Sequence, residues 1–137
     1  MRITLTTFVA AATIALALLT GCAKEPAIDA DQAERAVPQF HTALNDGNFD
    51  AIYEAAAPAL KSSQSQADFV RYLQAVRGKL GMIRGTERTG TRVEGQQATL
   101  TYKSAYEGGE ATEEFVILLE PEKEPVVVSY RMLSPAL

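Results

Sequence analysis

The hydrophobic periodicity of the chain changes at Gly81, and this change constrains the fold more than any other feature. Before Gly81, apolar residues recur at intervals of three and four, which is typical of one face of a helix. After Gly81, they alternate with polar residues, which is typical of a strand with one buried face. Helices followed by strands predict an α+β domain, because a parallel α/β sheet interleaves the two kinds of element.

Three helices are expected before Gly81. The first covers residues 31–46 and is kinked or divided at Pro38, because proline lacks the N–H that a helix interior needs. The second covers residues 49–56, capped by Asn48 and interrupted by Pro58. A loop over residues 61–68 then ends in a capping box, and the third helix buries a stripe of five residues: Phe69, Tyr72, Leu73, Val76 and Leu80.

Four strands are expected after Gly81, separated by turn signals that share glycine or proline: Gly90, Gly95, Gly108–Gly109 and residues 121–125. One strand places Ala98, Leu100, Tyr102, Ser104 and Tyr106 on one face. The next places Phe115, Ile117 and Leu119 on one face and Val116 and Leu118 on the other, and the last places Val126, Val128, Tyr130 and Met132 together. The short connections predict an antiparallel meander, with Phe69, Leu73, Phe115 and Ile117 in the core.

The first 21 residues have the pattern of an export signal, with Arg2 before an apolar run and small residues after it. Leu19, Thr20, Gly21 and Cys22 resemble the lipobox of bacterial lipoproteins, in which signal peptidase II cuts before the cysteine. The resemblance implies diacylglycerol and an N-acyl chain on Cys22, and two or more chains anchor a protein stably. The alternative is an ordinary secretory signal followed by a free cysteine.

The mature protein is expected to comprise a lipidated tether, residues 22–30, and a single domain, residues 31–137. Ala23 follows the cysteine, where lipoproteins retained at the inner membrane usually have aspartate. We therefore expect the periplasmic face of the outer membrane. Without Arg2 the chain has twelve basic and seventeen acidic side chains, about −5 in net charge, so nucleic acid is not an expected partner.

Three stretches together resemble the nuclear transport factor 2-like, or cystatin-like, cone: "ALNDGNFDAIYE", "FVRYLQAVRGKLG" and "VVVSYRML". Within that fold the chain resembles small bacterial lipoproteins of unknown function. The resemblance implies N-terminal helices packed into the concave face of a curved four-stranded sheet. The space between helices and sheet is then either a ligand pocket or filled core.

The candidate pocket residues are the only histidine, His41, and four tyrosines: Tyr53, Tyr72, Tyr102 and Tyr130. Some cone-fold enzymes use a histidine with tyrosines for proton transfer, but no acidic residue lies near His41 on its own helix face. We expect a partly exposed histidine without a role, tyrosines that close the core, and neither a metal nor a cofactor. The many charges after residue 71 are expected to pair across adjacent strands, although a basic strip could instead meet anionic headgroups.

Three hypotheses follow for function. The first is a lipid-anchored, non-enzymatic binding or interaction module of the cell envelope, with a small ligand or an envelope protein as partner. The second is a cone-fold enzyme that acts on a small apolar molecule. The third is an assembly factor that forms a homodimer through the outer face of the sheet, where Val116 and Leu118 would otherwise be exposed.

Overall fold

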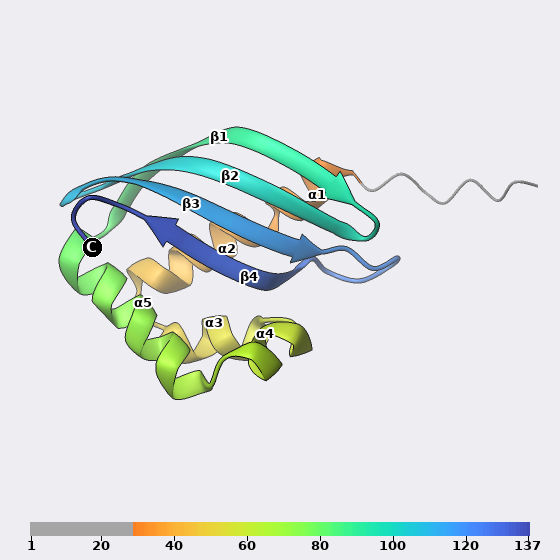
Figure 1. Cartoon of the computed structure of the whole chain (residues 1–137), viewed down its shortest axis with the longest axis horizontal. Helices are drawn as coiled ribbons and strands as arrows, with labels where there is room; N and C mark the ends of the chain where they lie inside the picture. The colour runs from red at the N-terminus through yellow and green to blue at the C-terminus, as the bar shows by residue number, and fades with distance from the viewer. Residues whose placement is uncertain (1–28) are drawn as a thin grey trace, which may run out of the picture.

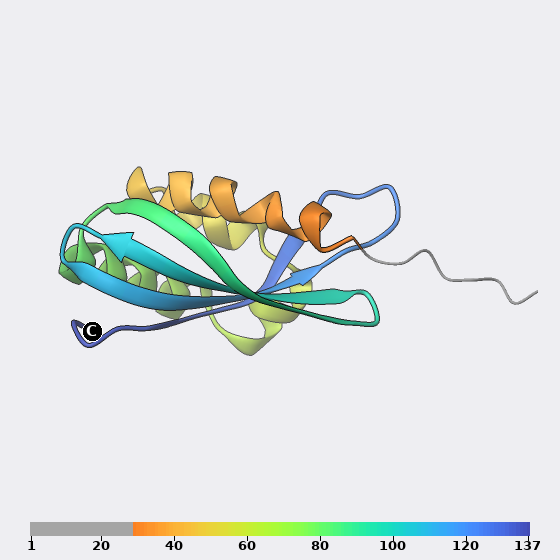
Figure 2. The same cartoon turned by 90° about the horizontal axis from the view of Figure 1, so that it is seen from above.

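The computed structural model describes residues 29–137 and shows an α+β domain with an N-terminal helical part and an open antiparallel sheet. The helices lie against one side of the twisted sheet (Figures 1 and 2). The helices are α1 (Ala30–Glu34), α2 (Ala36–Asn45), α3 (Phe49–Ala55), α4 (Pro58–Ser63) and α5 (Gln66–Leu80). The predicted cleavage site, Leu19 to Cys22, and the tether up to residue 28 lie outside the described residues.

The first predicted helix is divided at Arg35 rather than kinked at Pro38. Pro38 occupies the first turn of α2, where no N–H partner is needed. In a continuous helix its missing N–H would have bonded to the carbonyl of Glu34, so the interruption appears one turn before the proline. Asp29 begins α1 by accepting a hydrogen bond from the Asp31 backbone N–H at 2.9 Å.

Two expectations for the middle of the chain were wrong. The second helix ends before Pro58, as predicted, but residues 61–63 are helical rather than part of a loop, because Pro58 begins α4 and proline is favoured at the first helical position. Helix α3 begins at Phe49 without a capping hydrogen bond from the Asn48 side chain to the described backbone. The N-cap half of the capping box of α5 is confirmed, because Ser65 Oγ accepts from the Asp68 N–H at 3.2 Å. The Asp68 carboxylate accepts from the Ser65 hydroxyl at 2.7 Å, in place of the Ser65 backbone N–H of a full box.

The sheet has the order β1-β2-β3-β4 with every neighbouring pair antiparallel, as predicted for a meander. Its strands are β1 (Ile83–Glu94), β2 (Gln97–Tyr106), β3 (Gly109–Leu118) and β4 (Val126–Leu133). Gly90 is not a turn. It follows a register shift inside β1 at which Thr89 has no partner on β2, so the strand bends and continues.

A bulge in β4 corrects the predicted face of this strand. Val116 pairs with Ser129 and Ile117 pairs with Val127, which leaves Val128 as the extra residue. Because a bulge reverses the alternation, Val127 faces the core with Tyr130 and Met132, whereas Val126 and Val128 are only half-buried. The predicted faces of β2 and β3 are confirmed, with Val116 and Leu118 half-buried on the outer side.

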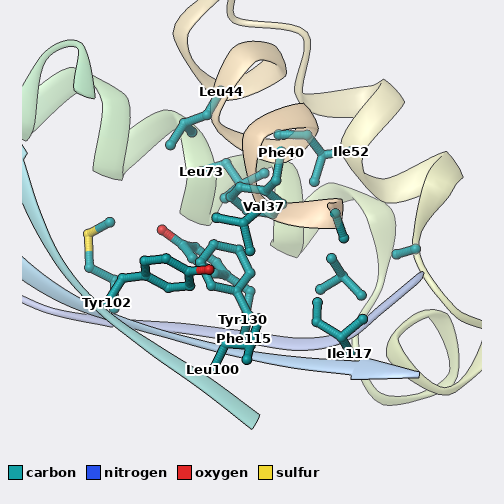
Figure 3. Packing of buried hydrophobic residues seen from close by; sticks show 14 of the residues in the cluster. Val37, Phe40, Leu44, Ile52, Leu73, Leu100, Tyr102, Phe115, Ile117 and Tyr130 are labelled. Atoms are coloured by element: carbon teal, nitrogen blue, oxygen red, sulfur yellow. The ribbon is translucent and has the colours of Figure 1, made fainter. Parts of the chain in front are cut away.

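The core lies between the helices and the inner face of the sheet, and Phe69, Leu73, Phe115 and Ile117 are at most 1 % exposed, as predicted. Figure 3 shows Phe40, Leu44 and Leu73 from the helices above Leu100, Phe115 and Tyr130 from the strands. Some surface charges pair across the sheet as expected: Arg84 with Glu107, Lys103 with Glu110 and Arg131 with Glu114. Arg88 of β1 instead pairs with Asp31 and Glu34 of α1.

Candidate functional site

A buried glutamate gathers four polar side chains from three elements of the core. Glu113 of β3 is 0 % exposed. Its Oε2 contacts His41 Nε2 at 3.0 Å and the Ser104 hydroxyl, and its Oε1 accepts from the hydroxyls of Tyr106 at 2.8 Å and Tyr130 at 2.7 Å. We call these five residues the Glu113 cluster. Each carboxylate oxygen thus has two partners, which fills its acceptor sites.

Local structure explains how the Glu113 cluster forms. Ser104 and Tyr106 alternate on the inner face of β2, and Glu113 lies on the inner face of β3 two residues before Phe115. Tyr130 pairs with Phe115 across β3 and β4. His41 comes from α2, which crosses this face of the sheet, and its ring meets the edge of Phe115 at 5.6 Å between centroids.

The cluster favours the ionised form of Glu113. Burial alone would raise its pKa, but the hydrogen bond and charge of His41, with the hydroxyls of Ser104 and Tyr130, lower the pKa below the usual 4.5. Because an ionised carboxylate can only accept, His41 Nε2 carries the hydrogen of this bond. The pKa of Tyr106 and that of Tyr130 are raised, by burial first and then by the Glu113 charge.

The expectation for His41 was wrong in one respect. The residue is buried, with 8 % of its surface exposed, rather than partly exposed. Its helix offers no acidic neighbour, as predicted, but the fold brings a carboxylate from 72 residues away. His41 therefore takes part in an ionic hydrogen bond that its own sequence context does not indicate.

The four predicted pocket tyrosines do not converge. Only Tyr130 joins His41 in the Glu113 cluster. Tyr102 donates to Glu34 Oε1 at 3.0 Å near α1, and Tyr72 accepts from the Met132 backbone N–H at 3.1 Å. Tyr53 donates to the Gln64 carbonyl at 3.0 Å, which ties α3 to the end of α4. As predicted, these phenols close the edges of the core.

Sequence reasoning missed three members of the cluster: Ser104, Tyr106 and Glu113. Alternation contained a usable signal, because Glu113 shares a face with Phe115 and Ile117 and is therefore an acidic residue at an inward position. A buried acid requires partners. Ser104 and Tyr106, both inward on the preceding strand, were the nearest candidates.

A separate groove lies between α2, α3 and the start of β4, with a volume of about 230 Å³. Its walls carry five alanines, and Gln39 is the only polar side chain among the lining residues. Gln39 and Ala55 are exposed, so the groove opens at the surface. We call it the α2–α3 groove; it is lined by Ala36, Gln39, Phe40, Ala43, Ala51, Ile52, Ala55, Ala56, Pro125, Val126 and Val127.

A broader hollow of about 700 Å³ lies over the β2–β3 turn and the C-terminal residues. Lys103 and Glu110, which line it, pair with each other at 3.4 Å. Among residues 29–137, no group of three or more histidine, cysteine, aspartate or glutamate side chains could hold a metal ion. No helix in that same range is long and apolar enough to cross a membrane.

No known family model, curated protein or solved structure matches this chain. The Glu113 cluster and the α2–α3 groove meet at two adjacent residues of α2. Phe40 lines the groove, and His41 belongs to the cluster.

Proposed function

We propose that the chain is a lipid-anchored, non-enzymatic binding module of the cell envelope, with the α2–α3 groove as its binding surface. One contrast supports this proposal. The Glu113 cluster is enclosed and its acceptors are occupied, whereas the open groove is lined by no ionisable side chain. The group that could transfer a proton and the surface that could receive a ligand are thus different places.

The competing hypothesis, a cone-fold enzyme, needs an acid or base within hydrogen-bond reach of its substrate. Both oxygens of Glu113 already accept from protein groups, and His41 uses Nε2 for the same contact. A substrate in the groove would meet Phe40 rather than His41. Such a site offers shape and apolar surface, which suffice for binding.

The groove fits one unbranched apolar chain. Alanine at five lining positions leaves space beside the larger side chains of Phe40, Ile52 and Val127, and the volume of about 230 Å³ would be filled by a single hydrocarbon chain. Each buried methylene contributes about 0.8 kcal/mol. Because the lining residues include no charge, a polar headgroup would remain outside.

The position of the groove indicates the source of the apolar ligand. One end of the groove, at the start of α2 and the loop before β4, lies at the end of the domain where the polypeptide enters at Asp29 (Figure 2). Cys22 is seven residues before Asp29, so a lipid on Cys22 would hold this end within about 25 Å of the bilayer. We therefore propose an acyl chain of an envelope lipid as the occupant.

The helices on a four-stranded antiparallel sheet support, at the level of architecture, the proposed nuclear transport factor 2-like cone. In such a cone the helices and the sheet enclose the core, and a ligand site lies where the packing is incomplete. The α2–α3 groove has this character, because alanines stand at its helix positions where larger side chains would fill it.

The anchor is tested by replacing Cys22 with serine. We expect uncleaved precursor and no incorporation of a labelled fatty acid, because the thiol carries the diacylglycerol. Changing Ala23 to Asp is the matched experiment for location: it should preserve labelling and move the protein to the inner membrane. Normal processing of the serine variant would contradict lipidation.

The groove is tested by filling it. In lipidated protein held in phosphatidylcholine nanodiscs, a diazirine-bearing decanol should label peptides of α2 and α3. Replacement of Ala51 with leucine should reduce this labelling severalfold, because the new side chain occupies the groove. Ala105→Leu, on the exposed outer side of β2, is the control. Equal labelling in both variants would contradict the proposal.

A further inference from the structure

The Glu113 cluster and the α2–α3 groove are mechanically connected through two adjacent residues. Phe40 lines the groove, and its ring packs against Tyr130 at 4.4 Å and Phe115 at 5.1 Å between centroids. His41, the next residue, bonds to Glu113, and Tyr130 donates to the same carboxylate. The groove wall formed by α2 is therefore held to the sheet by the buried glutamate.

Protonation of Glu113 would change this attachment. As a carboxylate, Glu113 accepts from four groups at once. As a neutral acid it must donate one hydrogen itself, so one of the four present donors loses its acceptor or has to turn around. Protonation would also remove the negative charge that strengthens the 3.0 Å hydrogen bond between His41 and Glu113.

We propose that the Glu113 cluster is an acid-sensitive attachment of α2 that controls the α2–α3 groove, so that the groove holds its apolar chain at neutral pH and loses one wall when Glu113 is protonated. This inference rests on the proposed binding function of the groove. It adds regulation of that site by a group that the ligand does not touch.

The direction of the effect follows from the folded environment. Burial raises the pKa of Glu113, but His41, Ser104 and Tyr130 outweigh burial and lower the pKa below 4.5. The stabilisation is therefore complete above about pH 4.5 and is lost as the pH falls through the lower, folded value. The other titratable groups that face Glu113 are His41 on α2, Tyr102 and Tyr106 on β2, Tyr130 on β4 and Tyr72 on α5.

The tyrosines stay neutral throughout this range, because burial raises the pKa of all four. The change of charge invoked here on the acid side is that of Glu113. Exposed ion pairs also lose their carboxylate charge in acid, but each of them contributes little to the free energy of unfolding. Acid-induced opening that is confined to α2 would therefore be due to the Glu113 cluster rather than to the surface ion pairs.

The test compares hydrogen exchange of α2 and α5 in the lipidated protein in phosphatidylcholine nanodiscs, at pH 7 and about pH 3.5. After correction for intrinsic exchange, we expect α2 amides to open at least about tenfold more in acid, while α5 is unchanged. Labelling of the groove by the diazirine-bearing decanol should decrease over the same pH range. Decanol does not ionise there, so such a decrease would reflect the protein. Equal opening of α5 would mean global unfolding and would overturn the proposal.

Two variants separate the possible failures. Glu113→Gln should show the open α2 at both pH values, and Glu114→Gln, on the outer face, should behave as the wild type. If Glu113→Gln does not fold, Tyr130→Phe is decisive, because loss of one donor should move the acid transition of α2 to higher pH. Absence of decanol labelling with a pH-dependent α2 would contradict the groove's function alone; labelling that persists in acid would contradict its regulation.

Discussion

His41 Nε2 lies 3.0 Å from Glu113 Oε2, although the two residues are 72 positions apart and belong to a helix and a strand. This bond attaches α2 to β3 inside the core, where an unpartnered carboxylate could not be accommodated. Within residues 29–137, each fully buried side-chain polar atom has a hydrogen-bond partner. Removing either residue of the pair would therefore leave a buried group without its partner.

Replacing Glu113 with glutamine should lower the free energy of unfolding by about 3 to 5 kcal/mol, because the amide nitrogen cannot accept from donors that now face it. Denaturant unfolding at pH 7 measures this loss. Glu114→Gln is the control, since this neighbouring side chain pairs with Arg131 on the outer face and should change stability by less than about 1 kcal/mol. Similar stability of the two variants would show that the cluster contributes little.

Stability should fall as the pH rises above 10. Burial raises the pKa of Tyr72, Tyr102, Tyr106 and Tyr130 above the usual 10.0. The charge of Glu113 adds to the shift at all four, and Glu34 adds to it at Tyr102. As the pH rises, these phenols ionise in the unfolded chain before they ionise in the folded one. The free energy of unfolding therefore decreases above pH 10. Tyrosinate absorbance of these residues should appear only with loss of circular dichroism. Full ionisation in a chain with native circular dichroism would contradict this expectation.

Replacing Phe115 with alanine should cost about 3 to 5 kcal/mol, which is the usual range for a buried phenylalanine. Its ring contacts four others, those of Phe40, His41, Tyr102 and Tyr130, so the cavity cannot close without disturbing the cluster. Thermal unfolding measures the effect. Val93→Ala, at a position that is 43 % exposed, should stay within about 0.5 kcal/mol.

Gly108 should not tolerate alanine. A Cβ at this position would lie 2.9 Å from the Lys79 carbonyl oxygen and 3.1 Å from that of Leu80, and both are backbone atoms at the end of α5. We expect a loss of about 1 to 3 kcal/mol in the free energy of unfolding. Gly85→Ala has no atom within 4 Å of its new Cβ and should be close to neutral. Equal effects would mean that the β2–β3 turn does not depend on close approach to α5.

Part of the candidate site was predictable from the residues alone. His41 and Tyr130 were identifiable as pocket candidates, and the alternation of β3 placed Glu113 on the same face as Phe115. That His41 meets Glu113 was not predictable, because the contact depends on how α2 crosses the sheet and on the register of β2 with β3. Neither property is encoded within a single helix or strand.

The sequence by itself determined the order and type of the main elements, because the helical and alternating periods on either side of Gly81 each reflect one local geometry. It also determined the buried faces of α5, β2 and β3. Only the tertiary structure decided the face of Val127, the continuation of β1 through Gly90 and the assembly of the Glu113 cluster. Bulges and helix–sheet contacts arise from packing between distant segments, where a shift of one residue reverses a face at little local cost.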